Sequence, residues 1–174
     1  LGRASRGKTR FALMWAYRMP RKVMPVKDAA AQLIDPSRLV YTDPADFCDF
    51  VRFVAARYFV QPDYFKVDGA CYLSIFDTAF FIRQLGPATA ARAITEARAI
   101  LAEMGLKLHL VAIDPIAEHQ PLLKEIGFDS VTHYVFLPDW KGDYLQEFSA
   151  CASQRQKQWA EYQPATGLPY VPSV

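Results

Sequence analysis

Five short apolar runs are spaced through this chain, and stretches with helical periodicity lie between them. The runs are Phe11–Arg18, Ala70–Asp77, Lys107–Asp114, Ser130–Phe136 and Leu168–Val174. Alternation of strand and helix is typical of a parallel sheet covered by helices, so the sequence predicts an α/β fold. Ligands of such folds bind at the carboxyl ends of the strands. The polar and aromatic residues that close the runs are therefore the first candidates for function.

Length and composition narrow the class of protein. The chain has 174 residues, of which 52% are hydrophobic, which is enough for one domain with a real core. With 20 basic and 18 acidic residues, the charge balance gives no reason to expect a nucleic-acid partner. No apolar run approaches the roughly 20 residues of a membrane helix, so we expect a soluble chain and no membrane partner. Because it begins with Leu1, we expect a piece of a longer protein, and the sequence assigns no compartment.

Helix signals separate the predicted strands. Asp43 and Pro44 form a capping signal before a periodic stretch that runs to about Phe59. Further helices are predicted over Thr78–Leu85, from Pro87 to Gly105, over Glu118–Ile126, and from a cap at Asp143 to an end at Pro164 and Gly167. Asp68 and Gly69 supply a hairpin turn that leads into the second strand.

The order of these elements fits an incomplete (β/α)8 barrel. A leading loop over residues 1–10 precedes strands near 11–16, 70–76, 107–113, 130–136 and 170–174. A small doubly wound sheet is the alternative, but neither phosphate-binding glycine motif of nucleotide folds follows a strand. A full barrel needs about 250 residues. We therefore predict one incomplete barrel domain over residues 1–174, with about five parallel strands and four crossover helices.

Four stretches, in order, resemble one enzyme family. Tyr64–Asp77 resembles the tyrosine–hydrophobic–x–hydrophobic–(asp/asn)-gly…ser-ile-tyr pattern of family-99-like glycoside hydrolases, which include endo-α-mannosidase-type enzymes and the related WbsX-type glycan-biosynthesis proteins. Phe11–Arg18 is similar to the family's phe-ala-leu-met-trp-ala-asn strand, and Gly127–Phe136 to its gly-phe-asp-ser-val-thr-ser-tyr strand. Thr166–Val174 resembles the start of its pro-tyr-x-pro-asn-val strand. The resemblance implies a (β/α)8 barrel with a sugar cleft at the strand carboxyl ends.

The sequence departs from this family at one important place. In endo-α-mannosidase-type members the first of these strands leads into a his-ile-glu-pro-tyr-type segment that supplies catalytic glutamate, and WbsX-type members often carry asn-glu there. Here Trp15 is followed by Ala16, Tyr17, Arg18 and Met19, which include no carboxylate. The family's chemistry therefore does not transfer directly to this chain.

Two aspartates are the candidate catalytic residues. Asp77 closes the second strand, where related sequences carry a carboxylate, and Asp114 closes the third. If these strands are neighbours, about 4.8 Å apart, the two side chains approach the separation of about 5–10 Å found in glycosidase carboxylate pairs. The structural alternatives are that Asp77 caps the following helix and that Asp114, before Pro115, starts a turn.

Aromatic and basic residues near the strand ends are the candidate substrate-binding residues: Trp15, Tyr17, Arg18, His133, Tyr134 and Tyr170. Aromatic faces pack against sugar C–H groups, and arginine donates forked hydrogen bonds to sugar oxygens. The alternatives are a core tryptophan, an exposed loop and a hydrogen-bonded core histidine. His133 and Tyr134 alternate in direction, so only one can point into the barrel.

No cofactor or metal site is predicted. The three cysteines are far apart, and the three histidines have no metal-binding spacing. The motifs of Ser/His/Asp and Cys/His nucleophiles are absent too.

Two hypotheses follow, both with a glycan or polysaccharide as partner. One is a glycoside hydrolase-like enzyme that uses carboxylate acid/base chemistry; the other is a carbohydrate-binding or glycan-assembly protein on the same scaffold. The sequence names no protein partner.

Overall fold

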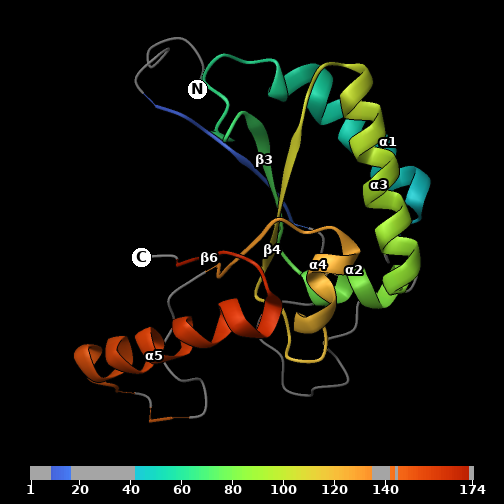
Figure 1. The fold of residues 1–174 in the computed structure, drawn as a ribbon. Coiled ribbons are helices and arrows are strands. Elements are labelled where there is room, and N and C mark those ends of the chain that lie inside the picture. Colours follow the sequence, from blue (N-terminus) through green and yellow to red (C-terminus); the bar gives the residue numbers. More distant parts are fainter. Residues whose placement is uncertain (1–8, 17–41, 135–141, 144, 173–174) are drawn as a thin grey trace, which may run out of the picture.

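In the computed structural model, the described part of the chain comprises residues 9–16, 42–134, 142–143 and 145–172. Five of its strands form a parallel sheet in the order β1-β3-β4-β5-β6, and β2 pairs with β3 in the antiparallel direction (Figure 1). The strands are β1 (Leu13–Trp15), β2 (Lys66–Val67), β3 (Ala70–Ile75), β4 (Leu108–Ile113), β5 (Ser130–Thr132) and β6 (Tyr170–Val171). The predicted α/β fold with about five parallel strands is confirmed.

Helices connect successive strands, as in a (β/α) barrel. They are α1 (Pro44–Val54), which continues into the π-helix η3 (Ala55–Phe59), then α2 (Thr78–Leu85), α3 (Pro87–Glu103), the 3-10 helix η4 (Gln120–Leu122), α4 (Leu123–Ile126) and α5 (Phe148–Thr166). The Asp43 carboxylate caps α1 by accepting from the N–H of Asp46 at 2.9 Å, as predicted. Within the described residues, no helix is both long and apolar enough to cross a bilayer.

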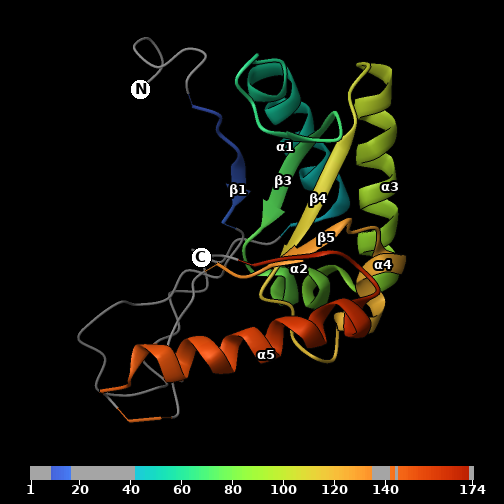
Figure 2. The same cartoon turned by 60° about the vertical axis from the view of Figure 1, so that its left-hand side comes forward.

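The main core lies between the sheet and the helices on one of its faces. Leu73 and Ile75 of β3 and Leu110 of β4 are fully buried and belong to one cluster with residues of α1 and α3. Alternate strand residues, such as Tyr72 and His109, point to the opposite face, where their rings stack 6.3 Å apart. Figure 2 shows that α1 and α3 stand on one side of the sheet. The opposite face corresponds to the inside of a barrel.

One arginine ties together the amino-terminal ends of β4 and β5. Arg98 of α3 donates to the carbonyl oxygens of Leu108 and Gly127, both at 2.8 Å, and forms an ion pair with Asp129 at 2.6 Å. The same carboxylate oxygen of Asp129 accepts from the N–H of Leu110 at 2.7 Å. In barrels the amino-terminal ends of the strands serve stability, and the carboxyl ends carry the functional site. The contacts of Arg98 therefore belong to the stabilising end of the sheet.

Two helix predictions were wrong in their bounds. The helix predicted over Glu118–Ile126 is a 3-10 turn followed by the short α4, since Pro121 lacks an N–H for a regular α-helical start. The last helix is capped by Glu147 rather than by Asp143, because the Glu147 carboxylate accepts from the N–H of Ala150 at 2.8 Å. That helix also continues past Pro164 and ends at Gly167, whose φ of 64° suits glycine.

Candidate functional site

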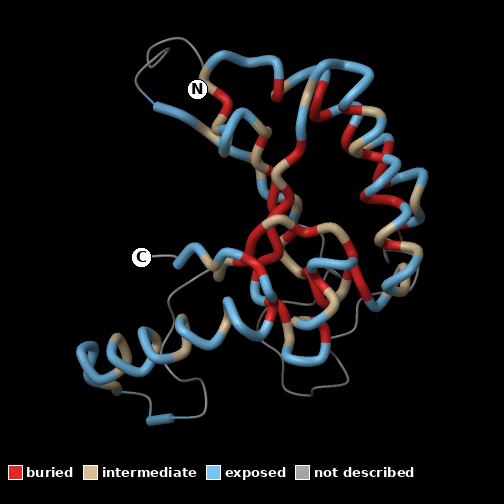
Figure 3. Tube along the Cα trace, viewed as in Figure 1, coloured by how far each residue is buried: buried red, intermediate tan, exposed pale blue. Residues whose placement is uncertain are grey.

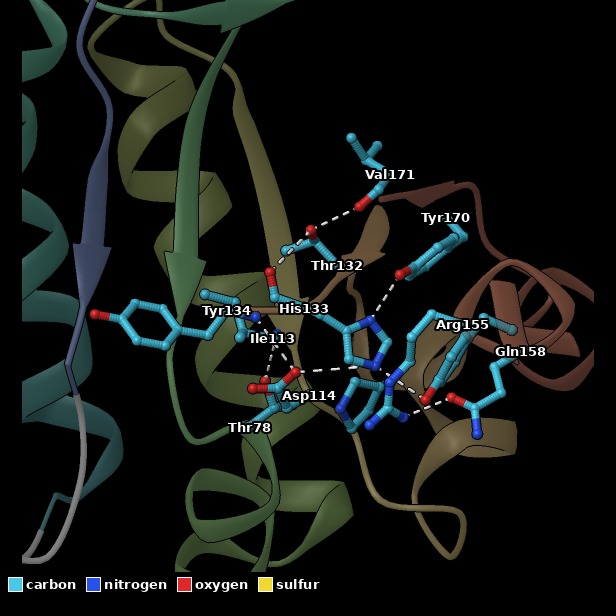
Figure 4. A network of polar contacts seen from close by, with 12 residues as sticks. Thr78, Ile113, Asp114, Thr132, His133, Tyr134, Arg155, Gln158, Tyr170 and Val171 are labelled. Carbon is cyan, nitrogen blue, oxygen red and sulfur yellow. Dashed lines mark hydrogen bonds and ion pairs between the residues drawn. The ribbon is translucent and has the colours of Figure 1, made fainter. Parts of the chain in front are cut away.

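Four polar or aromatic residues follow the carboxyl ends of three adjacent strands. Asp77 comes after β3, Asp114 directly after β4, and His133 and Tyr134 after β5. The strands are in register, with Ile75 paired to Ala112, and Ile113 paired to Thr132. Parallel strands therefore bring these side chains to one edge of the sheet. Figure 4 shows Asp114, His133 and Tyr134 at that edge.

Asp114 sits in a sharp turn at the end of β4. Its φ is +46°, a left-handed conformation that aspartate tolerates better than most residues. Its N–H donates to the carbonyl oxygen of Thr132 at 3.0 Å, and its Oδ1 accepts from the N–H of Tyr134 at 3.3 Å. The turn thus fixes a carboxylate, 47% exposed, beside the end of β5. The sequence analysis gave a turn at Asp114 as the alternative to a catalytic role, and the structure does contain that turn.

The surroundings of Asp114 favour its protonated form. Burial raises the pKa of this carboxyl, and the nearby Asp77 charge raises it too, whereas His133 and the Tyr134 N–H lower that pKa. The net direction is upward. A carboxylic acid with a raised pKa is the kind of group that acts as a general acid near neutral pH.

His133 is held by two tyrosines from different elements. Its Nδ1 lies 2.8 Å from the hydroxyl of Tyr170 in β6, and its Nε2 lies 2.9 Å from the hydroxyl of Tyr162 in α5. The same Nε2 is 3.9 Å from Oδ1 of Asp114, too far for a direct hydrogen bond. Burial lowers the pKa of the imidazole, and the Asp114 charge opposes that shift. A neutral ring suits these partners, because it donates from one nitrogen and accepts at the other.

The two tyrosines stack on each other with ring centroids 5.0 Å apart and an interplanar angle of 19°. Burial raises the pKa of both hydroxyls, that of Tyr170 to about 12, so both stay protonated at neutral pH. Tyr170 was predicted at the site, but Tyr162 was not. Tyr162 lies on the last predicted helix, and the spacing of residues along a helix does not reveal which strand a given face of that helix contacts.

Asp77 caps α2, as the structural alternative proposed. Its Oδ1 accepts from the N–H of Phe80 at 2.9 Å. Its charge nevertheless acts on Asp114, so the two carboxylates belong to the same neighbourhood. Next to it, the buried Thr78 hydroxyl donates to the carbonyl oxygen of Ile75 and accepts from the N–H of Ile113, both at 3.0 Å. Thr78 thereby ties the ends of β3 and β4 together beneath both aspartates.

A pair of aromatic residues, the exposed Tyr134 and the half-buried Phe76, also lies near Asp114. The ring of Tyr134 meets the ring of Phe76 edge to face at 4.7 Å, and Tyr134 is 52% exposed. His133 and Tyr134 therefore point in different directions, as the alternation predicted. His133 packs with the tyrosines, and Tyr134 stands over the end of β3.

Trp15 lies apart from this group. Its ring stacks on Phe50 at 4.6 Å and on Phe47 at 5.6 Å, both in α1, and meets Phe81 of α2 edge to face. It is a half-buried member of the helix-facing core, so the structure does not bring it to Asp114. Tyr17 and Arg18 lie outside the described residues. Their role, like that of Trp15 in sugar binding, stays a prediction.

The other histidines have different surroundings. His109 bonds the Ser130 hydroxyl at 2.9 Å on the barrel-side face of the sheet, and His119 is buried after β4. In the described ranges, no three His, Cys, Asp or Glu side chains gather closely enough to hold a metal ion.

The chain was compared with known proteins. No protein-family model matches it, and neither does any curated protein. Among solved structures, it is similar to the GH99 endo-alpha-mannosidase from Bacteroides thetaiotaomicron, with a TM-score of 0.55, 14% identity, and coverage of 78% of this chain and 37% of that one. It is also similar to a glycoside hydrolase-like protein, with a TM-score of 0.51, 21% identity, and coverage of 85% of this chain and 41% of that one.

These similarities concern the fold, because both identities are low. They show that this chain shares part of the fold of those two structures, which fits a partial barrel. The chain spans about two fifths of the length of each of these structures.

Proposed function

We propose that this chain is a glycoside hydrolase-like domain that acts on a glycan or polysaccharide at the carboxyl ends of its strands. The observation that carries the proposal is the position of Asp114. This half-exposed carboxyl group is fixed by backbone contacts at the end of a central strand, and burial raises its pKa. Glycosidic bonds are cleaved with the help of such a group, which protonates the leaving oxygen.

In this proposal Asp114 is the acid/base carboxylate and Asp77 is its partner. The cap of α2 uses one oxygen of Asp77, and a carboxylate has a second oxygen that can accept from a sugar hydroxyl. The charge of Asp77 also raises the pKa of Asp114, which keeps the acid protonated to higher pH. Two carboxylates whose surroundings separate their roles are typical of glycosidases.

The aromatic residues around Asp114 supply the sugar-binding surface. The exposed ring of Tyr134 offers a face for sugar C–H groups. His133 and Tyr170 offer polar atoms on the other side of the carboxylate. At the end of β1, Trp15, Tyr17 and Arg18 are proposed as further contacts with a longer glycan, in keeping with the position of that strand beside β3.

A second candidate function has its own support. A non-hydrolytic binding or glycan-assembly protein, as in the WbsX-type relatives suggested by the sequence, needs no carboxylate pair. The helix cap occupies one oxygen of Asp77, and no carboxylate is present in residues 16–19. Both observations support this candidate.

A glycan panel separates the two candidates. The full-length protein is incubated with yeast α-mannan, β-mannan, dextran and chito-oligosaccharides, and both binding and new reducing ends are measured. Yeast α-mannan is included because a similar fold belongs to an endo-alpha-mannosidase. Hydrolysis predicts products that fall by about 10² or more in Asp114→Asn, the usual contribution of acid/base catalysis. The exposed Asp49 on α1 gives the control variant Asp49→Asn, which we expect to match the wild type.

Each outcome selects among the hypotheses. Binding without products supports the second candidate. Neither binding nor products with any glycan contradicts both candidates.

A further inference from the structure

Helix α5 places one of its tyrosines, Tyr162, against the candidate site. Of its 19 residues, only Thr166 is buried, and Figure 3 shows the helix as a mostly exposed arm that extends away from the sheet. Tyr162, one turn before its end, is half-buried and places its hydroxyl 2.9 Å from Nε2 of His133. The proposed site acquires a polar contact from this helix that the sheet alone does not provide.

The two tyrosine contacts fix the orientation of the His133 ring. Tyr170 holds Nδ1 from β6, and Tyr162 holds Nε2 from α5, so turning the ring over breaks two hydrogen bonds at once. In the held orientation, Nε2 is the nitrogen that lies 3.9 Å from the carboxylate of Asp114. The edge-to-face contact of the imidazole with Tyr162, at 4.6 Å between centroids, adds to this restraint.

We propose that Tyr162 is a positioning residue: together with Tyr170 it holds Nε2 of His133 toward Asp114, so that α5 is part of the candidate site. The proposal names a residue of the site proposed above, and its role in turnover rests on that proposed function. The positioning itself does not, because it is a property of the chain without any glycan.

The charged groups around His133 set the expected effect of removing the hydroxyl. Asp114 faces the ring from the end of β4, and Arg155 acts on it from α5, while Asp77 and Glu161 act on its partners Asp114 and Tyr162. Both forms of the ring bond Tyr162 through Nε2, but the hydrogen bond donated by a charged imidazolium is stronger than one made by the neutral ring. Loss of the Tyr162 hydroxyl therefore penalises the charged form more, and the pKa of His133 should fall.

The test is an NMR titration of the histidine rings in the full-length protein. In Tyr162→Phe we expect the midpoint of His133 to fall by at least about 0.5 pH unit, a differential interaction well within that of one lost hydrogen bond. The midpoint of His109, whose ring nitrogen bonds Ser130, should not change. The control variant Tyr58→Phe removes a hydroxyl from the π-helix that follows α1, and we expect no change at His133. An unchanged or raised midpoint in Tyr162→Phe overturns the proposal.

A second measurement does not require a variant. In the wild-type protein, nuclear Overhauser effects from the ring protons of His133 should place its Nε2 side beside Tyr162 and Asp114 in a single ring orientation, and averaging over two ring orientations overturns the proposal. If the glycan panel fails while His133 shows a single ring orientation and the midpoint falls, the positioning stands and the proposed function does not. If the panel succeeds, Tyr162→Phe should lower kcat about tenfold with little change in KM, and equal activity of the variant contradicts a role in turnover.

Discussion

Replacing Asp77 separates its role as a helix cap from its proposed role in sugar chemistry. In Asp77→Asn the amide oxygen still accepts from the N–H of Phe80, so the free energy of unfolding should change by less than about 0.5 kcal/mol. In Asp77→Ala the acceptor is lost, which should cost about 1 kcal/mol. For a chain of this length that corresponds to a fall in Tm of about 2–4 °C. Urea unfolding and thermal melting measure both values.

The functional effects should not follow the loss of the cap. Both variants remove the charge that raises the pKa of Asp114, so both should lower that pKa and shift the alkaline limb of the activity, where the general acid loses its proton, to lower pH. We expect turnover, or glycan affinity if there is no turnover, to fall at least about tenfold in Asp77→Asn despite its intact cap.

Helix α1 supplies a matched control. Asp43 caps α1 in the same way that Asp77 caps α2. Asp43→Asn and Asp43→Ala should therefore reproduce the stability effects without the loss of activity. Full activity in Asp77→Asn would refute the reasoning and leave Asp77 as a cap alone.

Three further expectations test the surroundings of the site. Burial raises the folded-state pKa of Asp114 above its ordinary 3.8, so the charged carboxylate destabilises the fold. In urea unfolding at pH 7, Asp114→Asn should therefore be more stable than the wild type. The difference in stability should disappear as the pH falls below 3.8. Thr78→Val removes both hydrogen bonds of the buried Thr78 hydroxyl and should cost about 2–4 kcal/mol. Thr95→Val on the exposed side of α3 should stay within about 0.5 kcal/mol, and equal effects would contradict the bridging role of Thr78. Trp15→Ala removes a ring that stacks on Phe50 and should cost about 3–5 kcal/mol in the same assay; a variant as stable as the wild type would contradict the role of Trp15 in the core.

The sheet could be predicted because its signals are local. Each buried strand is a short apolar run, and glycines or capping residues separate it from the next helix, so the number of strands and their parallel pairing follow from the pattern. The bounds of α5 were harder to predict. Asp143 and Glu147 are both possible caps, and the choice between them depends on which carboxylate reaches a free N–H.

The candidate site was only partly predictable. Asp77, Asp114 and His133 stand at strand ends, and parallel topology brings strand ends together. Tyr162 lies on a helix, and whether its hydroxyl meets His133 depends on the angle at which α5 approaches the sheet, which no periodicity encodes. Trp15 shows the converse: alternation along a strand leaves open which face meets the helices, and its ring packs with Phe47 and Phe50.

The central claim is that a glycan binds at the carboxyl ends of the strands, around Asp114. Chemical-shift mapping with the glycans of the panel tests this most directly, because it locates the ligand whether or not a bond is cleaved. The account predicts perturbed signals from Asp114, His133 and Tyr134, and unperturbed signals from Arg98 and Asp129 at the opposite end of β4 and β5. Perturbations confined to that opposite end, or none with any glycan, would contradict it.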